Sequence, residues 1–429
     1  MSYSRFVLPS VLPCCLYFTL IVSSALAADW TGFRGPNGQG ISADKDVPTK
    51  WSATENIAWK TAVEVQGWSS PIVSGDRVFI SGTTSDGATC HVIAFDRLSG
   101  KVMWDKKVFA QQPRHKRKEN SYATPTPVTD GKRVYATFGS GSIAAVDFSG
   151  ENVWVNHDVK FHSHHGLSSS PIIVDGLLVM PYDGSSDGEN NKVGWKIPWK
   201  DAELLALDTD TGKAKWHGKR GLSRLSHGSP CLMQVNGKTQ IISGAGDVVQ
   251  GHDPTNGELI WTIYSKGEGV SPSVVVGGGH VFSCSGFEAP TIRVIRADGN
   301  GDVTKTHMAW EQREGVPALA SLLYLAPHIY SVTDKGVVNC FDAKSGDVVW
   351  QNRIGGKHSV SPTLIDGNIY FFDELTSEAT VIKAGAKFEL VEKNSLLGET
   401  MKASPAVSQG NIFVRTTGHL ICIGPKPVK

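Results

Sequence analysis

The chain has 429 residues, of which 42 are Lys or Arg and 41 are Asp or Glu, so its formal charge is +1. This balance excludes a polybasic nucleic-acid wrapper and an acidic solvated tail. Apolar residues make up 40% and charged residues 19%, with 46 Gly and 21 Pro, which favours a folded, turn-rich β protein over a disordered chain.

Residues 1–27 have the pattern of a secretory signal peptide. Arg5 precedes an apolar stretch from Val11 to Val22, and Ala25-Leu26-Ala27 follows. This is the order of a basic start, an apolar core and a cleavage site, and the core is shorter than the roughly 20 residues that span a bilayer. We therefore expect cleavage after Ala27, no integral membrane segment afterwards, and a periplasmic or secreted protein without a lipidation site.

Export would place the remaining five cysteines where disulfides can form. Their spacing gives no paired motif, and two of them occupy a repeat position that elsewhere holds a small residue such as Ala94 or Ala206. We interpret them as buried thiols that act as small hydrophobes, while an oxidised pair stays open. They are Cys90, Cys231, Cys284, Cys340 and Cys422.

Short apolar segments that start near a proline recur eight times along the chain. PIVSGDRVFIS from Pro71 and PTLIDGNIYFFD from Pro362 are two of them, and each is a β-prone run, a turn and a second β-prone run. Gly and Asp supply the positive φ of tight hairpins, so each segment predicts a strand A, a turn and a strand B. The segments start at Pro71, Pro127, Pro171, Pro230, Pro272, Pro317, Pro362 and Pro405.

The second half of each unit carries the pattern Asp-x3-Gly-x3-Trp. It occurs at 96–104, 208–216, 253–261 and 342–350. Asp closes a turn, Gly takes a left-handed conformation, and Trp lies on the following strand. The pattern therefore predicts a strand C, a turn and a strand D.

The two ends of the repeat complete each other. The last unit, 402–424, ends without a strand D, whereas residues 56–60 (NIAWK) have the features of a strand D with no strand A before them. Pairing them closes a ring without open sheet edges, with about 47 residues a unit. The sequence thus predicts an all-β fold, an eight-bladed β-propeller of four-stranded blades. The expected parts are a signal peptide (1–27), an N-terminal arm (28–50), the propeller (51–424) and a tail (425–429).

With these motifs the chain resembles the pyrroloquinoline quinone (PQQ)-like β-propeller repeat family. The segments AFDRLSGKVMW, ALDTDTGKAKW and CFDAKSGDVVW look like the tryptophan-docking motif of that family. The resemblance implies the propeller fold and two functional branches. Quinoprotein alcohol dehydrogenases bind PQQ and calcium in the central funnel, whereas assembly factors of the BamB type bind proteins and no cofactor. The segments DWTGFRGPNGQGIS and NSYATPTPVTDG are similar to an exported subgroup without assigned activity.

Irregular connections gather on the face that carries the D–A and B–C connections. They are a basic loop at 114–118, a histidine run at 161–165 and an insertion at about 183–201. Binding residues of β scaffolds usually lie in such loops, so we expect a ligand or partner here. The candidate binding residues are Trp68, Arg114, Arg117, Asn120, Tyr122, His164, Asp183, Trp195, Trp199 and His227.

The histidines of this face also suggest a metal centre. His162, His164, His165 and His227, with Asp183, could hold zinc or copper, because imidazole and carboxylate ligands suit either ion. The spacing does not follow a fixed ligand motif such as HExxH. Histidines that bond to the backbone or line a wet channel are the alternative.

Two functions of different class remain. The first, which we favour, is an exported, non-catalytic binding or scaffold propeller without a cofactor, whose partner is an envelope or secreted protein or a small ligand in the central funnel. The second is an oxidoreductase that uses PQQ and calcium to oxidise alcohols or sugars, with the protein orienting cofactor and substrate. No nucleic-acid partner is expected, because phosphate binding needs a broad positive surface. We expect a monomer.

Overall fold

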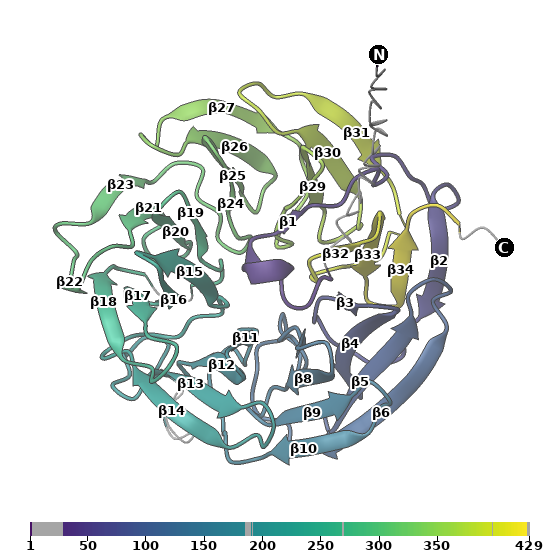
Figure 1. The fold of residues 1–429 in the computed structure, drawn as a ribbon, viewed down its shortest axis with the longest axis horizontal. Coiled ribbons are helices and arrows are strands. Elements are labelled where there is room, and N and C mark those ends of the chain that lie inside the picture. The colour runs from purple at the N-terminus through teal and green to yellow at the C-terminus, as the bar shows by residue number, and fades with distance from the viewer. Residues whose placement is uncertain (2–28, 185–189, 191, 268–269, 397, 427–429) are drawn as a thin grey trace.

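The computed structural model describes residues 1, 29–184, 190, 192–267, 270–396 and 398–426. Their strands form eight sheets around one axis (Figure 1), which confirms the predicted eight-bladed propeller. In the described part of the chain no helix is long and apolar enough to cross a membrane. Apart from Met1, the predicted signal peptide lies outside the described residues.

Each blade is an antiparallel meander from an inner strand A to an outer strand D, and we number the blades in chain order. Blade 1 has β3 (Ile72–Ser74), β4 (Arg77–Thr83), β5 (Thr89–Asp96) and β6 (Val102–Ala110); blade 2 has β7 (Val128–Thr129), β8 (Arg133–Thr137), β9 (Ile143–Asp147) and β10 (Asn152–Asn156); blade 3 has β11 (Ile172–Val174), β12 (Leu177–Tyr182), β13 (Glu203–Asp208) and β14 (Ala214–Lys219); blade 4 has β15 (Cys231–Val235), β16 (Lys238–Ala245), β17 (Val248–His252) and β18 (Leu259–Tyr264). Blade 5 has β19 (Val275–Gly277), β20 (His280–Ser285), β21 (Thr291–Arg296) and β23 (Met308–Gln312); blade 6 has β24 (Leu323–Leu325), β25 (His328–Val332), β26 (Val337–Asp342) and β27 (Val348–Arg353); blade 7 has β28 (Thr363–Ile365), β29 (Asn368–Phe372), β30 (Ala379–Lys383) and β31 (Leu390–Asn394); blade 8 has β32 (Ala406–Ser408), β33 (Asn411–Arg415), β34 (His419–Ile423) and β2 (Ile57–Ala62). Two short strands add to the edges in parallel, with β1 (Ile41–Ser42) beside β28 and β22 (Gly301–Asp302) beside β18.

The ring closes through the two ends of the repeat, as predicted. Strand β2 pairs antiparallel with β34, with Ile57 opposite Ile423 and Trp59 opposite Cys422. The Trp59 indole N–H also donates to the carbonyl of Arg97 in blade 1, at 2.9 Å. Strand β2 therefore completes blade 8 and fastens it to blade 1.

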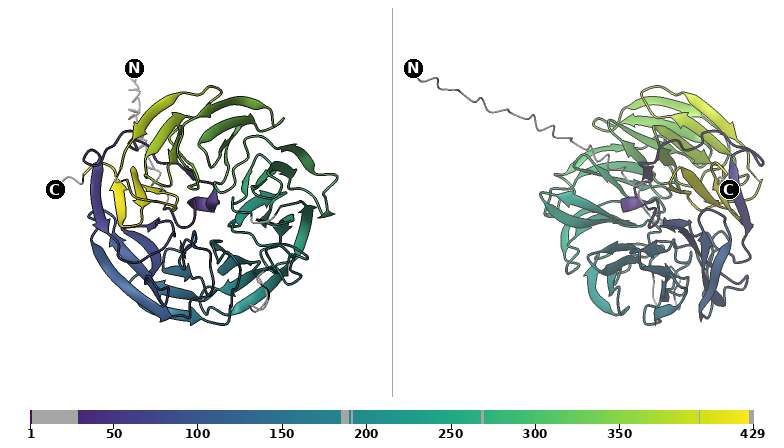
Figure 2. Two further views of the ribbon diagram at one scale, coloured as in Figure 1. Left: turned by 180° about the vertical axis from the view of Figure 1, so that it is seen from behind. Right: turned by 45° about the vertical axis from the view of Figure 1, so that its right-hand side comes forward.

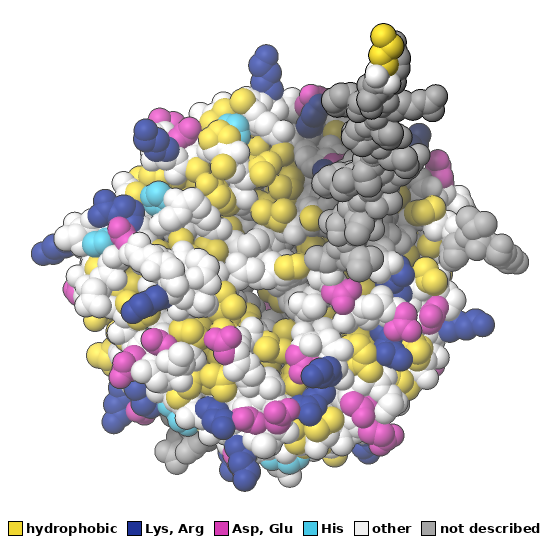
Figure 3. Space-filling view, viewed as in Figure 1, with side chains coloured by type: hydrophobic (Ala, Val, Ile, Leu, Met, Phe, Trp, Pro, Cys, Tyr) yellow, Lys and Arg dark blue, Asp and Glu magenta, His cyan; other side chains and the backbone are white. Residues whose placement is uncertain are grey.

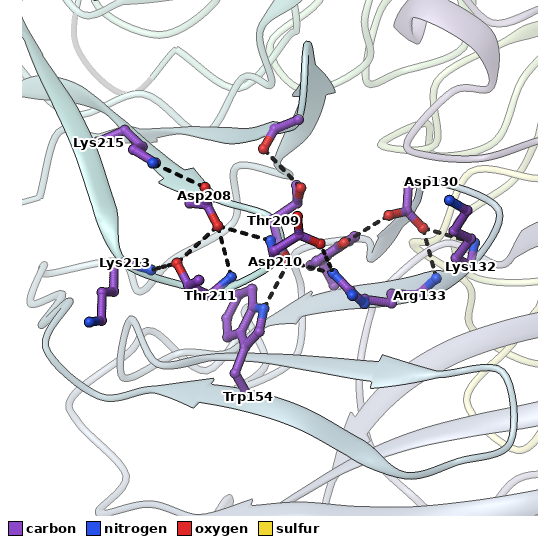
Figure 4. Close-up of polar contacts among 12 residues, drawn as sticks. Asp130, Lys132, Arg133, Trp154, Asp208, Thr209, Asp210, Thr211, Lys213 and Lys215 are labelled. Atoms are coloured by element: carbon purple, nitrogen blue, oxygen red, sulfur yellow. Dashed lines mark hydrogen bonds and ion pairs between the residues drawn. The ribbon is translucent and has the colours of Figure 1, made fainter.

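Tryptophans fasten neighbouring blades in the same way around the ring. The indole N–H of Trp154 in blade 2 donates to the carbonyl of Thr209 in the C–D turn of blade 3, at 2.9 Å (Figure 4). Gly212 in that turn has a φ of 69°, and a Cβ on it would lie 2.5 Å from the Trp154 ring. The Asp-Gly-Trp spacing thus encodes contacts between blades as well as turns within them.

Serine and threonine hydroxyls form a second set of contacts around the axis. The backbone N–H of Ser70 donates to Thr126 Oγ1, that of Thr126 to Ser170 Oγ, and that of Ser170 to Ser229 Oγ, each at 2.9 Å. The series goes on through Ser273, Ser321 and Ser361, and Ser404 donates back to Ser70 Oγ. We call these eight residues the hydroxyl ring; all are buried.

The five cysteines that the structure describes are all buried free thiols, which confirms that interpretation. Burial raises the pKa of Cys340 and of Cys422 to about 12. Both therefore stay protonated at neutral pH and serve as packing residues.

The N-terminal arm crosses the middle of the ring on the face with the A–B and C–D turns. Its turn η1 (Pro36–Gly38) lies near the axis (Figure 1) and is also seen in the middle of the ring from behind (Figure 2). On the arm face, charged side chains of both signs lie mainly around the rim (Figure 3). The candidate site predicted from the sequence lies on the opposite face.

Candidate functional site

Four connections build the candidate site. They are the loop from β6 to β7 (111–127), the loop from β10 to β11 (157–171), the insertion between β12 and β13 (183–202) and the loop from β14 to β15 (220–230). Three are D–A connections and one is a B–C connection, and in an antiparallel meander all of these reach the same face.

The structure brings together three predicted histidines and one predicted tryptophan. The His164 ring stacks flat on Trp195, with ring centroids 4.1 Å apart and planes at 4°. The His165 ring meets Trp195 edge-on at 5.4 Å and His227 edge-on at 5.7 Å. His115, from the basic loop, lies 5.6 Å from His164. All four connections thus meet at one aromatic cluster.

Backbone contacts hold the histidine run in place. The Asn120 side-chain amide donates to the carbonyl of His165 at 3.1 Å and to Ser168 Oγ at 3.0 Å. The backbone N–H of Arg117 donates to the same carbonyl at 3.3 Å. Asn120 and Arg117 therefore lie in the predicted site, and through these bonds they fix the position of His165.

Burial keeps these histidines uncharged at neutral pH. It lowers the pKa of His165 to about 3, and the neighbouring His227 adds to this shift. Burial alone lowers the pKa of His227 to about 4. The pKa of His164 is also lowered, first by burial and then by His115 and Arg117. The positive charge of this face therefore comes from Lys and Arg.

Three lysines lie over the aromatic rings of this face. Nζ of Lys196 is 4.8 Å from the centre of the Trp195 ring, Nζ of Lys116 is 4.9 Å from that of Tyr122, and Nζ of Lys402 is 5.3 Å from that of Trp68. A cation over an aromatic face is attracted to it by about 0.5–1 kcal/mol at exposed sites. We call this set the basic–aromatic surface; its members are Trp68, Lys116, Tyr122, His164, Trp195, Lys196 and Lys402.

The basic–aromatic surface is continuous with the basic loop. Lys402 Nζ donates to the carbonyl of Glu119 at 2.9 Å, and the Glu119 carboxylate lies 3.3 Å from Arg117 Nε. The second acid near Lys402 is Glu374, which is buried and pairs with Lys357 at 3.0 Å and with Lys402 at 3.6 Å. Both acids near Lys402 are thus paired with cations of the same face.

Three other predicted residues have different surroundings. Asp183 is 1% exposed and lies 2.6 Å from the guanidinium of Arg220, which is also buried. Trp199 pairs through its backbone with Ser223 and contacts Tyr182 edge-on at 6.1 Å. Arg114 is half-buried in the basic loop. Asp183 thus supports the packing of blades 3 and 4 and does not reach the binding surface.

The histidine cluster does not have the geometry of a metal centre. Among the described residues, no group of three or more His, Cys, Asp or Glu is placed to hold a metal ion. His164 lies flat on Trp195, His165 stands perpendicular to it, and Asp183 is paired with Arg220. The structure therefore does not support the centre predicted from His162, His164, His165 and His227.

Sequence reasoning missed Lys196 and Lys402 of this surface. Lys196 follows Trp195 directly, so the inserted loop carried a local signal. Lys402 lies about 280 residues from the basic loop that it contacts, at Glu119, and only ring closure brings the two together.

Comparisons with known proteins agree with this fold. A family model described as outer membrane protein assembly factor BamB matches residues 40–179 and 92–352. BamB from Moraxella catarrhalis is 12% identical, with a TM-score of 0.60 over 86% of this chain and 99% of that one. The computationally designed protein Ika8 is 11% identical, with a TM-score of 0.58 over 84% and 96%. Quinohemoprotein alcohol dehydrogenase from Comamonas testosteroni is 13% identical, with a TM-score of 0.45 over 94% and 82%. The search of curated proteins finds no significant match.

Proposed function

We propose that this protein is an exported, non-catalytic binding propeller. The premise is that the chain belongs to the PQQ-like β-propeller family, whose matching model carries the description outer membrane protein assembly factor BamB. The basic–aromatic surface takes an acidic segment of an envelope or secreted protein. The observation that carries the proposal is the placement of Lys196, Lys116 and Lys402 over aromatic rings on one face.

The chemistry of this surface suits an acidic protein partner. Trp, Tyr and Arg are the residue types that contribute most to protein interfaces, and Trp68, Tyr122, Trp195 and Arg117 are all part of this face. The partly buried histidines are neutral, so a partner carboxylate would be attracted by the Lys and Arg side chains. It would compete there with Glu119 for Arg117 and with Glu374 for Lys402. Long-range attraction to such a face raises the association rate and falls with added salt.

Site-specific photo-crosslinking in the native host tests the proposal. A photoreactive phenylalanine analogue replaces Trp195, and the matched control carries it at Leu98, which is 54% exposed in a C–D turn of the opposite face. We expect a discrete crosslinked protein from position 195 and none from position 98. The crosslink should weaken in Lys196→Glu/Lys402→Glu and at higher salt, because both changes reduce attraction to an acidic partner.

Two outcomes would count against the proposal. One is equal crosslinking from both positions, and the other is a crosslink that neither salt nor charge reversal changes.

Fractionation of the host cells tests export, since the protein should be recovered from the periplasm or the medium and not from the cytoplasm.

A titration with PQQ and calcium tests the alternative oxidoreductase. Among the described residues no group of three or more His, Cys, Asp or Glu is placed to hold a metal ion, and we therefore favour the binding propeller over the oxidoreductase. We expect calorimetry to give no stoichiometric heat of binding. Binding at micromolar or tighter affinity would replace our proposal with an oxidoreductase and call for a screen of alcohols and sugars.

A further inference from the structure

In the inner strand of each blade, one residue has its backbone N–H and C=O directed away from strand B and toward the axis. In blade 1 this residue is Val73, which lies next to the last pair of the A–B hairpin, Ser74 and Arg77. Its N–H points away from β4 and donates to the carbonyl of Trp30 in the N-terminal arm, at 2.9 Å. The arm is thus hydrogen-bonded along the inner edge of a sheet.

The arm satisfies the equivalent N–H in four further blades. It uses two backbone carbonyls and two side-chain amide oxygens for this. The bonds run from Thr129 to the carbonyl of Thr31 (2.9 Å), from Leu364 to the carbonyl of Gly40 (2.8 Å), from Leu232 to Asn37 Oδ1 (2.8 Å) and from Val276 to Gln39 Oε1 (2.8 Å). At each of these inner edges the strand N–H therefore donates to an amide carbonyl oxygen of the arm.

Three blades receive no such bond: among the described residues, nothing in the arm accepts the N–H of Ile173 in blade 3, of Tyr324 in blade 6 or of Val407 in blade 8. Blade 3 differs from the other two in the large cavity in front of its inner strand. Ile172 to Val174 pair with Leu177 to Val179 in the register of blade 1, so the N–H and C=O of Ile173 point toward the axis. Among the described residues, nothing accepts this N–H. Ile173 is partly exposed, whereas Val73 is fully buried.

A cavity of about 620 Å³ lies in front of this strand edge, between the arm and blades 2 to 4. Its walls include Phe33, Val128, Leu232 and Met233, with hydroxyl and amide groups among them. No Lys or Arg lines it, and its single charged residue is Asp175. The volume lies in the range of ligand pockets, and the walls favour an uncharged guest over an anion.

We propose that this cavity receives a short, extended and uncharged peptide segment of a partner protein, which adds to the free inner edge of β11. The peptide would accept from the Ile173 N–H and donate to the Ile173 carbonyl, as in strand addition to a sheet edge. The arm supplies the precedent, since it meets the neighbouring edges with amide oxygens. The Ile172 and Ile173 side chains pack between blades, so the backbone gives affinity and the walls select small or apolar side chains.

The site is independent of the proposed function. The cavity opens on the arm face, which is the face seen in Figure 3, whereas the basic–aromatic surface lies on the opposite face. It also differs in chemistry, because it has no cation and one acid.

Selection from a phage library of random seven-residue peptides tests the inference. Selected sequences are made as fluorescent peptides, and anisotropy measures their binding to four proteins: wild type, Ile173→Pro, Gln234→Trp and Trp195→Ala. Proline removes the N–H at an edge where it does not pair within the sheet. Gln234 is exposed at the cavity, so a tryptophan there fills the mouth at little cost in stability.

We expect uncharged, β-prone peptides to be enriched. They should bind Ile173→Pro and Gln234→Trp at least about tenfold more weakly than wild type, and Trp195→Ala equally well. Hydrogen exchange at the Ile173 amide should slow when peptide is bound. If Ile173→Pro does not fold, the comparison with Gln234→Trp decides.

Three results would overturn the inference. They are no enrichment over an unrelated immobilised protein, equal binding to wild type and to the folded cavity variants, or binding that Trp195→Ala abolishes. The last result would place the peptides on the basic–aromatic surface and leave the proposed function standing.

Discussion

Two ion pairs of equal length have different consequences at the scale of single residues, because their burial differs. Asp183 and Arg220 are 2.6 Å apart with side chains 1% and 0% exposed, and Arg133 and Asp210 are 2.6 Å apart with side chains 26% and 79% exposed (Figure 4). A charge left unpaired in the interior cannot recover its lost hydration, whereas a surface charge can. Asp183 is therefore a structural residue, although the sequence pointed to a binding role.

Asp183→Asn should lower the free energy of unfolding by about 3–5 kcal/mol, because it leaves the buried Arg220 guanidinium without its counter-charge. The matched control, Asp210→Asn, removes a carboxylate from an exposed pair of the same length and should cost less than about 1 kcal/mol. Urea unfolding of both variants followed by tryptophan fluorescence measures the difference. Equal losses in the two variants would contradict the structural role of the buried pair.

The neutral histidines predict a dependence of stability on pH. Burial lowers the pKa of His165 to about 3 and that of His227 to about 4 in the folded chain, against about 6.5 in an unfolded chain. The unfolded chain therefore takes up these protons first, and stability is lost as the pH falls from about 6.5 toward these folded values.

Replacing His227 by Phe keeps an aromatic ring beside His165 and removes one of these protons. The Tm of wild type should fall between pH 6.5 and 5, a window above the range in which most carboxylates titrate, and the fall should be shallower in His227→Phe. Differential scanning calorimetry at half-unit intervals measures both slopes. Identical slopes would mean that His227 is protonated equally in the folded and unfolded chains.

At the scale of elements, the hydroxyl ring links the blades where the sequence shows only a turn signal. Ser or Thr precedes the strand-A proline in seven blades, and in six of them this residue belongs to the hydroxyl ring. In blades 5 and 6 the ring residues Ser273 and Ser321 instead follow Pro272 and Pro317, and strands β19 and β24 begin three and six residues after these prolines. The feature that recurs in all eight blades is thus the hydroxyl that accepts the N–H of the neighbouring blade, and its position relative to the proline varies.

Removing one hydroxyl of the ring should cost more than removing an exposed one. Ser170→Ala leaves the buried N–H of Thr126 without its acceptor and should lower the free energy of unfolding by about 1–3 kcal/mol. Ser149, in an exposed C–D turn, is the control, and Ser149→Ala should stay within about 0.5 kcal/mol of wild type. Denaturant unfolding measures both, and a neutral Ser170→Ala would show that water replaces the hydroxyl.

Hairpins and docking tryptophans could be predicted because their chemistry is local. The Asp-x3-Gly-x3-Trp spacing places a left-handed Gly and the next strand within nine residues, and Trp154 and Gly212 follow it or a shortened form of it. The binding face was predicted from the same local irregularities, and the contact of His164 with Trp195 fits that prediction. The partners of Asp183 and Trp68 could not be predicted, because Arg220 and Lys402 come from other connections and only the ring geometry brings them near.

At the scale of the whole molecule, the N-terminal segment has two separable tasks. Residues 29–44 cross the axis and bond the inner strands, while β2 completes blade 8 and carries Trp59, which docks into blade 1. Ring closure was predictable, because an unpaired strand D at one end matched a missing strand D at the other. The path of the arm was not, because it follows no repeat and uses side-chain amides such as those of Asn37 and Gln39.

Two truncations separate these tasks. A chain that begins at Trp51 lacks the arm but keeps β2, so its ring should stay closed and monomeric, with a lower Tm because the arm no longer satisfies inner N–H groups such as that of Val73. A chain that begins at Val65 also loses β2, which exposes the edge of β34 and removes the Trp59 contact to blade 1. Open sheet edges pair with other chains, so this variant should elute as oligomers or aggregates. Size-exclusion chromatography with light scattering measures the difference. If both truncated chains are monomers with the same Tm, closure through β2 contributes nothing that the other seven blades do not supply.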